Sequence, residues 1–145
     1  MIPSKRMSRD TQPIKILVVE DNPADARLIS EGFAECGHKC DLHRVSTLEQ
    51  AKNTLEGERF HMLISDMGVP HEATVEFLQW ARSHTEGKMP IIVLSGYPDP
   101  NPSYQAGANA FISKPGDVHE FFRRVRTLMH FWINVATLPR AQTHK

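Results

Sequence analysis

The sequence predicts an α/β protein in which helices cover both faces of a parallel β-sheet. Short apolar runs rich in β-branched residues recur along the chain, and each is followed by a segment with apolar residues at helical spacing. Each apolar run also ends abruptly at a polar residue. Because regular alternation of strands and helices favours a parallel sheet, we expect a doubly wound (βα)5 fold, a three-layer sandwich.

Five runs are expected to form the strands. Ile14–Val19 and Ile91–Leu94 are the clearest, since continuous apolar runs are typical of strands that are buried on both faces. The remaining strands are expected at residues 39–45, 60–65 and 110–113. The run at 39–45 alternates weakly, with Cys40, Leu42 and Val45 as its apolar members.

The first two helices carry sequence signals at both ends. Asn22-Pro23 combines an N-cap residue with a proline suited to the first helical position, and Gly37 is placed to end that helix. Ser46 and Glu49 form a Ser-x-x-Glu pattern, which predicts a capping box at the start of the second helix. Gly57 is expected to end it.

The later helices differ in the strength of their patterns. A third helix is predicted around Val75–Ala81, whereas the proline-rich stretch Gly96–Pro102 allows at most a short helix before Gly107, because proline disrupts helix interiors. Asp117 is expected to cap the last helix. Its apolar stripe is the strongest in the chain: Val118, Phe121, Phe122, Val125, Leu128, Met129 and Trp132.

Length and charge limit the organisation and the partners of the chain. Its 145 residues predict one folded domain at 14–130, a flexible tail at 1–13 and a C-terminal extension at 131–145, with no DNA-binding output domain. The formal net charge is zero, which argues against nucleic acid as a partner. No apolar run is long enough to span a membrane, and two cysteines are too few for a disulfide framework, so we expect a cytoplasmic protein.

Polar residues gather where the predicted strands end: Glu20, Asp21, Asp66, Ser95 and Lys114. Ligands of open parallel sheets bind outside the carboxyl ends of the strands, and in a flavodoxin-like strand order of 2-1-3-4-5 the first and third strands are neighbours. Three carboxylates would then converge, which favours a bound Mg²⁺. A cation, an ammonium group and a hydroxyl together suit a phosphoryl group, and one carboxylate could attack phosphorus to form an acyl phosphate.

Four segments in this order and spacing resemble one protein family. They are Ile16–Pro23, Leu63–Pro70, Ile91–Ser95 and Ala106–Pro115. Together they resemble the receiver domain of two-component response regulators, which has the chemotaxis-regulator fold, over about residues 14–130. The resemblance implies a signalling protein that accepts a phosphoryl group and is not an enzyme.

The resemblance also implies roles for individual residues. Asp66 would accept the phosphoryl group from a kinase phosphohistidine. Glu20 and Asp21 would form an acidic pair, with Asp21 the more direct Mg²⁺ ligand, and the backbone carbonyl of Gly68 would complete the metal shell.

Three further residues match the switch that such proteins use. Ser95 and Lys114 would bind the phosphoryl oxygens after modification. Phe111 matches the aromatic residue that turns inward as the serine closes on the phosphoryl group.

A narrower resemblance involves both ends of the predicted domain. The segment Glu20–Asp25, the pair Phe131-Trp132 and the later Thr137-Leu138-Pro139 resemble small single-domain regulators that are paired with phytochrome histidine kinases. This implies a sensor histidine kinase or a phosphotransfer protein as partner, and a homodimer formed through the last helix and the extension. Output would pass through protein–protein interaction, self-association or phosphoryl relay.

Other functions remain open at this stage. Ala73-Thr74 stands where the family usually has Asp-Gly, which leaves room for a binding module that works without phosphorylation. A Mg²⁺-dependent phosphohydrolase is disfavoured because position 68 is glycine where a second aspartate is needed, and a flavin or nucleotide site lacks a phosphate-cradling loop after the first strand. The spacing of the cysteines and histidines between Cys36 and His43 is not a standard zinc pattern. The arginines at 123, 124 and 126 most simply form a solvated helix face.

Overall fold

The computed structural model describes residues 12–35, 37–66 and 72–139. Its centre is a five-stranded parallel sheet in the order β2-β1-β3-β4-β5. The strands are β1 (Ile14–Glu20), β2 (Cys40–Val45), β3 (Met62–Asp66), β4 (Ile91–Ser95) and β5 (Ala110–Ser113). The predicted fold class and strand order are therefore confirmed.

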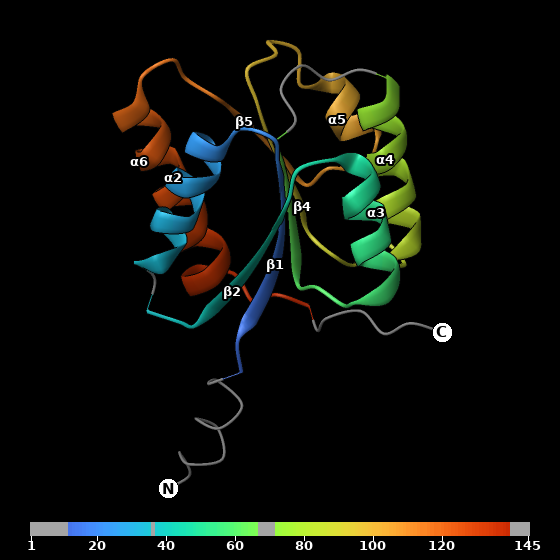
Figure 1. Ribbon diagram of the computed structural model, residues 1–145, viewed down its shortest axis with the longest axis horizontal. Coiled ribbons are helices and arrows are strands. Elements are labelled where there is room, and N and C mark those ends of the chain that lie inside the picture. The colour runs from blue at the N-terminus through green and yellow to red at the C-terminus, as the bar shows by residue number, and fades with distance from the viewer. Residues whose placement is uncertain (1–11, 36, 67–71, 140–145) are drawn as a thin grey trace, which may run out of the picture.

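The helices form two layers, one on each face of the sheet (Figure 1). One layer contains α2 (Pro23–Ala34) and α6 (Val118–Met129), and the other contains α3 (Leu48–Gly57), α4 (Glu72–His84) and α5 (Asn101–Gln105). The chain continues after α6 as a short π-helix, η1 (His130–Val135). Within the described ranges, no helix is both long enough and apolar enough to cross a membrane.

Strand β1 shows why the sheet is buried on both faces. Ile16 and Val18 belong to the core that packs under α2 and α6, whereas Leu17 and Val19 belong to the core under α3 and α4. Consecutive strand residues point to opposite faces, so a strand between two helical layers must be apolar at every position. The continuous apolar run predicted this arrangement.

Capping at the start of α2 is confirmed, but that of α3 is displaced. Asn22 Oδ1 accepts hydrogen bonds from the backbone N–H groups of Ala24 and Asp25 at 2.8 and 3.1 Å. The predicted Ser46 cap is wrong: Thr47 is the N-cap, and its Oγ1 accepts the N–H of Gln50 at 3.1 Å. Thr47 has the extended backbone (φ −132°, ψ 159°) that an N-cap needs.

The end of α2 also differs from the prediction. The helix ends at Ala34, with Glu35 as its C-cap, so Gly37 lies beyond the end. Phe33 is the last side chain of α2 that is buried in the core, and the next two residues are exposed. The helix therefore stops where its packing against the sheet stops.

The last helix changes its winding near the chain end. The α-helix stops at Met129, and in η1 the N–H of Ala136 bonds to the carbonyl of Phe131 at 2.7 Å, five residues back. Trp132 and Leu138 still pack against the core under α2 and α6. Val118, the first member of the predicted stripe, is 58% exposed and does not contribute to the core.

The proline-rich stretch behaves as predicted. The five-residue α5 begins only at Asn101, after Pro100 has supplied the N-cap position, and Pro102 lies in its first turn. Proline is tolerated there because the first helical N–H groups lack partners within the helix.

Gly32 permits the close approach of α2 to α6. A Cβ atom at this position would lie 2.6 Å from Val125 Cγ1, which is a branched side chain held in the core. We expect Gly32→Ala to lower the free energy of unfolding by about 1–2 kcal/mol, even though alanine favours helices more than glycine does. Urea unfolding followed by circular dichroism measures this change.

Gly57→Ala is the matched control for that substitution. Gly57 is the last residue of α3, and a Cβ there would meet no atom within 4 Å. We expect a neutral or slightly stabilising effect. Equal losses at both positions would show that the packing against Val125 is not the cause.

Candidate functional site

The register of the sheet brings the polar strand ends together. Glu20 at the end of β1 pairs with Asp66 at the end of β3, and both are 0% exposed. On the other side of β3, the backbone N–H of Lys114 donates to the carbonyl of Ser95 at 2.8 Å. Four of the predicted site residues therefore lie along one edge of the sheet.

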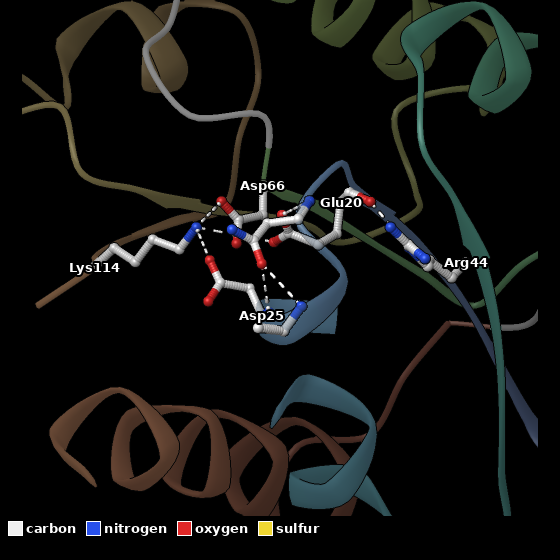
Figure 2. Close-up of polar contacts among 7 residues, drawn as sticks. Glu20, Asp25, Arg44, Asp66 and Lys114 are labelled. Atoms are coloured by element: carbon white, nitrogen blue, oxygen red, sulfur yellow. Dashed lines mark hydrogen bonds and ion pairs between the residues drawn. The ribbon is translucent and has the colours of Figure 1, made fainter. Parts of the chain in front are cut away.

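Lys114 is the positively charged residue that the carboxylates of this edge surround (Figure 2). Its Nζ lies 2.7 Å from Asp66 Oδ1, 2.7 Å from Asp25 Oδ2 and 3.9 Å from Glu20 Oε1. Burial opposes the charge of the ammonium group, but the hydrogen bonds that it donates to Asp25 and Asp66, with the negative charges of Asp66 and Glu20, outweigh burial and raise the pKa of Lys114. The ammonium group therefore stays charged across the physiological range.

Asp25 is the residue that sequence analysis missed. One carboxylate oxygen from each of Glu20, Asp25 and Asp66 lies within 4.8 Å of the other two. A signal was present: the Asn22 cap places Asp25 in the first turn of α2, at the same edge as the strand ends. Asp21, in contrast, is exposed and does not belong to this group among the residues the structure describes.

The remaining metal-ligand assignments stay predictions. The role of Asp21 as the more direct Mg²⁺ ligand is one of them, since its side chain is exposed and lies outside the carboxylate group described above. Gly68, whose carbonyl was expected to complete the shell, lies outside the described residues.

The surroundings of Glu20 disfavour the charged form of its carboxyl group. Its Oε2 accepts the backbone N–H of Asn22 at 2.8 Å, and the Nε of Arg44 donates to its backbone carbonyl at 3.0 Å (Figure 2). Burial, helped by the neighbouring Asp66, raises the pKa of Glu20 to about 9, although the Asn22 hydrogen bond acts in the opposite direction. Without a further cation, Glu20 is thus mostly protonated at neutral pH.

The donor set fits a hard divalent cation. Glu20 Oε1 and Asp66 Oδ2 are buried and have no hydrogen-bond partner within the described part of the chain. Buried polar atoms in proteins are normally satisfied. In the cation-free protein a proton held between Glu20 and Asp66 satisfies the pair, and a bound cation would take the place of that proton. Carboxylate oxygens are the ligands that Mg²⁺ and similar ions prefer.

Ser95 and Phe111 are the two other residues to which the resemblance assigns a role in the switch. Ser95 is buried, and its Oγ accepts the N–H of Tyr97 at 3.0 Å. The Phe111 side chain packs in part against the core under α3 and α4, and its N–H donates to the Tyr104 hydroxyl at 3.1 Å. Whether these residues switch with phosphorylation stays a prediction.

Of the two other stretches considered as sites, the structure describes the arginines of α6 in full. Cys36, one member of the cysteine–histidine stretch, lies outside the described residues. The three arginines of α6 each pair with an acidic side chain: Arg123 and Arg124 with Glu120, and Arg126 with Glu35. This agrees with a solvated helix face.

A buried carboxylate beside an ammonium group and two further carboxylates is suited to phosphoryl acceptance. The carboxylate can serve as the nucleophile, and the ammonium group can stabilise the negative charge of the transferred group. The site is also placed where ligands of doubly wound sheets bind.

Comparison with known proteins agrees with this chemistry. Residues 16–126 match the response regulator receiver domain family. The chain is 28% identical to the response regulator Rcp1 of Synechocystis sp., over 93% of this chain and 100% of that protein.

Two solved structures are also similar to this chain. The phosphorylated cyanobacterial phytochrome response regulator RcpA is 27% identical, with a TM-score of 0.78 over 88% of this chain and 99% of that one. The Mn²⁺-bound form of Rcp1 is 24% identical, with a TM-score of 0.80 over 88% of this chain and 99% of that one. The fold, the edge of carboxylates around Lys114 and these matches lead to one conclusion: the chain belongs to the response regulator receiver domain family.

Proposed function

We propose that the chain is a response regulator that accepts a phosphoryl group on Asp66 from a histidine kinase. The observation that carries the proposal is the position of Asp66, a fully buried carboxylate with Lys114 Nζ at 2.7 Å and the Glu20 carboxyl beside it. It acts as a signalling switch and not as an enzyme with a substrate of its own. We place it in the cytoplasm, in line with its family.

The transfer follows from the groups at the site. A carboxylate oxygen of Asp66 attacks the phosphorus of a phosphohistidine, a P–O bond forms, and the P–N bond breaks. The leaving imidazole takes a proton from solvent. Lys114 is already within hydrogen-bond distance of Asp66 and stabilises the negative charge on the phosphoryl oxygens.

Glu20, Asp21 and Asp66, together with the backbone carbonyl of Gly68, are the groups proposed to hold Mg²⁺. When bound, this cation neutralises negative charge between the acceptor and the phosphoryl donor. The support is the pair of unpartnered buried oxygens, Glu20 Oε1 and Asp66 Oδ2. The related Rcp1 is described in an Mn²⁺-bound form, which agrees with a divalent-cation site of this kind.

A phytochrome-type histidine kinase is the proposed phosphoryl donor. The match to Rcp1 covers 100% of Rcp1 and 93% of this chain, and RcpA is described as a phytochrome response regulator. A phosphotransfer protein is the alternative donor, since it would present the same phosphohistidine.

Output is proposed to pass through protein–protein contact, with a homodimer as one form. Phe131 is 49% exposed in η1, just after α6, and it lines a cavity of about 320 Å³ together with Ile112, Leu128 and Trp132. Glu120, Arg123 and Arg124 line the same cavity, so the proposed contact has an apolar centre with a charged rim, as protein interfaces do. The extension from residue 131 would contribute to that contact, and light scattering on phosphorylated and unphosphorylated samples tests whether dimerisation follows modification.

Intact-mass spectrometry tests the proposed acceptor chemistry. We expect incubation of the full chain with acetyl phosphate and Mg²⁺ to add one phosphoryl group that is stable in acid and labile in base, as an acyl phosphate is. Omission of Mg²⁺ is the control, and it should greatly reduce the mass gain. No gain with Mg²⁺ present would favour a binding module that works without phosphorylation.

A further inference from the structure

Lys114 has two equally close carboxylate partners that come from different layers of the fold. Asp66 Oδ1 and Asp25 Oδ2 each lie 2.7 Å from its Nζ. The side chain of Asp66 is fully buried, whereas that of Asp25 is 25% exposed. Asp25 is therefore the more exposed of the two partners, and in Figure 2 its carboxylate lies below the ammonium group while that of Asp66 lies above it.

The position of Asp25 is fixed by the start of α2. Its backbone N–H donates to Asn22 Oδ1 at 3.1 Å, which places it in the first helical turn. The unpaired N–H groups of a helix start favour a negative charge at this position. The Asp25–Lys114 ion pair therefore joins the first turn of α2 to the residue that follows β5.

We propose that Asp25 is a positioning residue that holds Lys114 and competes with the phosphoryl group on Asp66 for its ammonium group. This inference rests on the proposed function of Asp66. A phosphoryl group needs the same cation that Asp25 contacts, and the Asp25 carboxylate lies within 4.8 Å of the Asp66 carboxylate oxygen.

Competition for Lys114 and repulsion between negative charges both destabilise the phosphorylated state. The phosphoryl group adds negative charge beside a carboxylate that is already present, and like charges at short range oppose each other. Asp25 also retains part of the interaction that Lys114 could otherwise give to the phosphoryl oxygens. Asp25 thus makes the modified state less stable than it would be with a neutral residue at this position.

Binding of beryllium trifluoride, a phosphoryl mimic, tests this role without covalent chemistry. We compare the full-length wild type with Asp25→Asn by fluorine NMR titration at saturating Mg²⁺, so that a changed affinity for the cation does not enter the result. The loss of one partly exposed carboxylate next to an ammonium group should tighten binding roughly fivefold. A residue with only a structural role would not, when replaced, improve binding of the mimic.

Two further variants complete the test. Asp25→Glu keeps the negative charge and should bind the mimic as weakly as the wild type does. Asp41→Asn removes an equal charge from an exposed residue of β2, near the opposite end of the sheet, and should leave the affinity unchanged. If Asp25→Asn does not fold, Asp25→Ser provides the same loss of charge.

The possible outcomes separate this inference from the proposed function. Equal or weaker binding by Asp25→Asn, with normal binding by the wild type, overturns the role of Asp25 and leaves Asp66 as the acceptor. If the wild type neither binds the mimic nor gains a phosphoryl group, the proposed function fails and the inference fails with it. Tighter binding by Asp25→Asn alone supports both.

Discussion

Asp66→Asn is expected to abolish the gain of a phosphoryl group completely. The amide nitrogen has no free lone pair for attack on phosphorus, and the amide has nearly the same shape as the carboxylate it replaces. Asp66 is fully buried in the site, so a change of shape would disturb its neighbours, whereas this change removes mainly the charge and the nucleophile. Intact-mass spectrometry with acetyl phosphate and Mg²⁺ measures the result.

Because other carboxyl groups are close by, Asp66→Asn tests which residue accepts the phosphoryl group. Glu20 and Asp25 lie beside Asp66, and either could in principle accept a phosphoryl group in its place. Asp41→Asn, on the exposed side of β2, should be modified as fully as the wild type and controls for the loss of one negative charge. Modification of Asp66→Asn at the wild-type rate would show that another residue is the acceptor.

The fold could be predicted because the signals for its elements are local and agree with one another. In β1, β3 and β4 the apolar runs are continuous, and a strand between two helical layers must have such a run. The N-cap of α3 was misplaced because Ser46 and Thr47 both carry a hydroxyl group. Which of the two becomes the N-cap depends on where β2 ends and the chain turns. The pairing of β2 within the sheet sets that point, so local sequence does not.

The site could be predicted only in part, for a related reason. Strand register fixes that Glu20 and Asp66 are neighbours, and the end of β5 brings Lys114 to the same edge. The sequence does not determine which way the acidic side chains after β1 turn. Asp25 reaches Lys114 because the first turn of α2 carries it there, whereas Asp21 stays exposed.

Glu20→Gln is expected to stabilise the cation-free protein by about 3 kcal/mol near neutral pH. Burial raises the pKa of Glu20 to about 9 in the folded protein, whereas its ordinary value is 4.5. Between these two values the folded protein binds more protons than the unfolded chain, so the contribution of Glu20 to stability decreases as pH rises. Glutamine keeps the shape of the protonated group and does not titrate.

The pH dependence of the difference between the two proteins identifies the cause. Urea unfolding in the presence of a chelator should show near-equal stability around pH 5 and a growing advantage of Glu20→Gln up to about pH 9, by at most about 1.4 kcal/mol per pH unit. Burial lowers the pKa of His61, which changes stability in the opposite sense, but it does so equally in both proteins. Glu76→Gln, at an exposed position of α4, should show no such trend.

Addition of Mg²⁺ should reverse the ranking of the two proteins. A ligand that binds only the folded state stabilises it in proportion to the logarithm of its concentration above the dissociation constant. The wild type offers the cation the Glu20 Oε1 atom that otherwise lacks a hydrogen-bond partner, whereas a neutral amide is a poorer ligand. The carboxylate that destabilises the cation-free fold is then the group that couples folding to cation binding, and a stabilisation by Mg²⁺ that is equal in both proteins would exclude Glu20 from the metal shell.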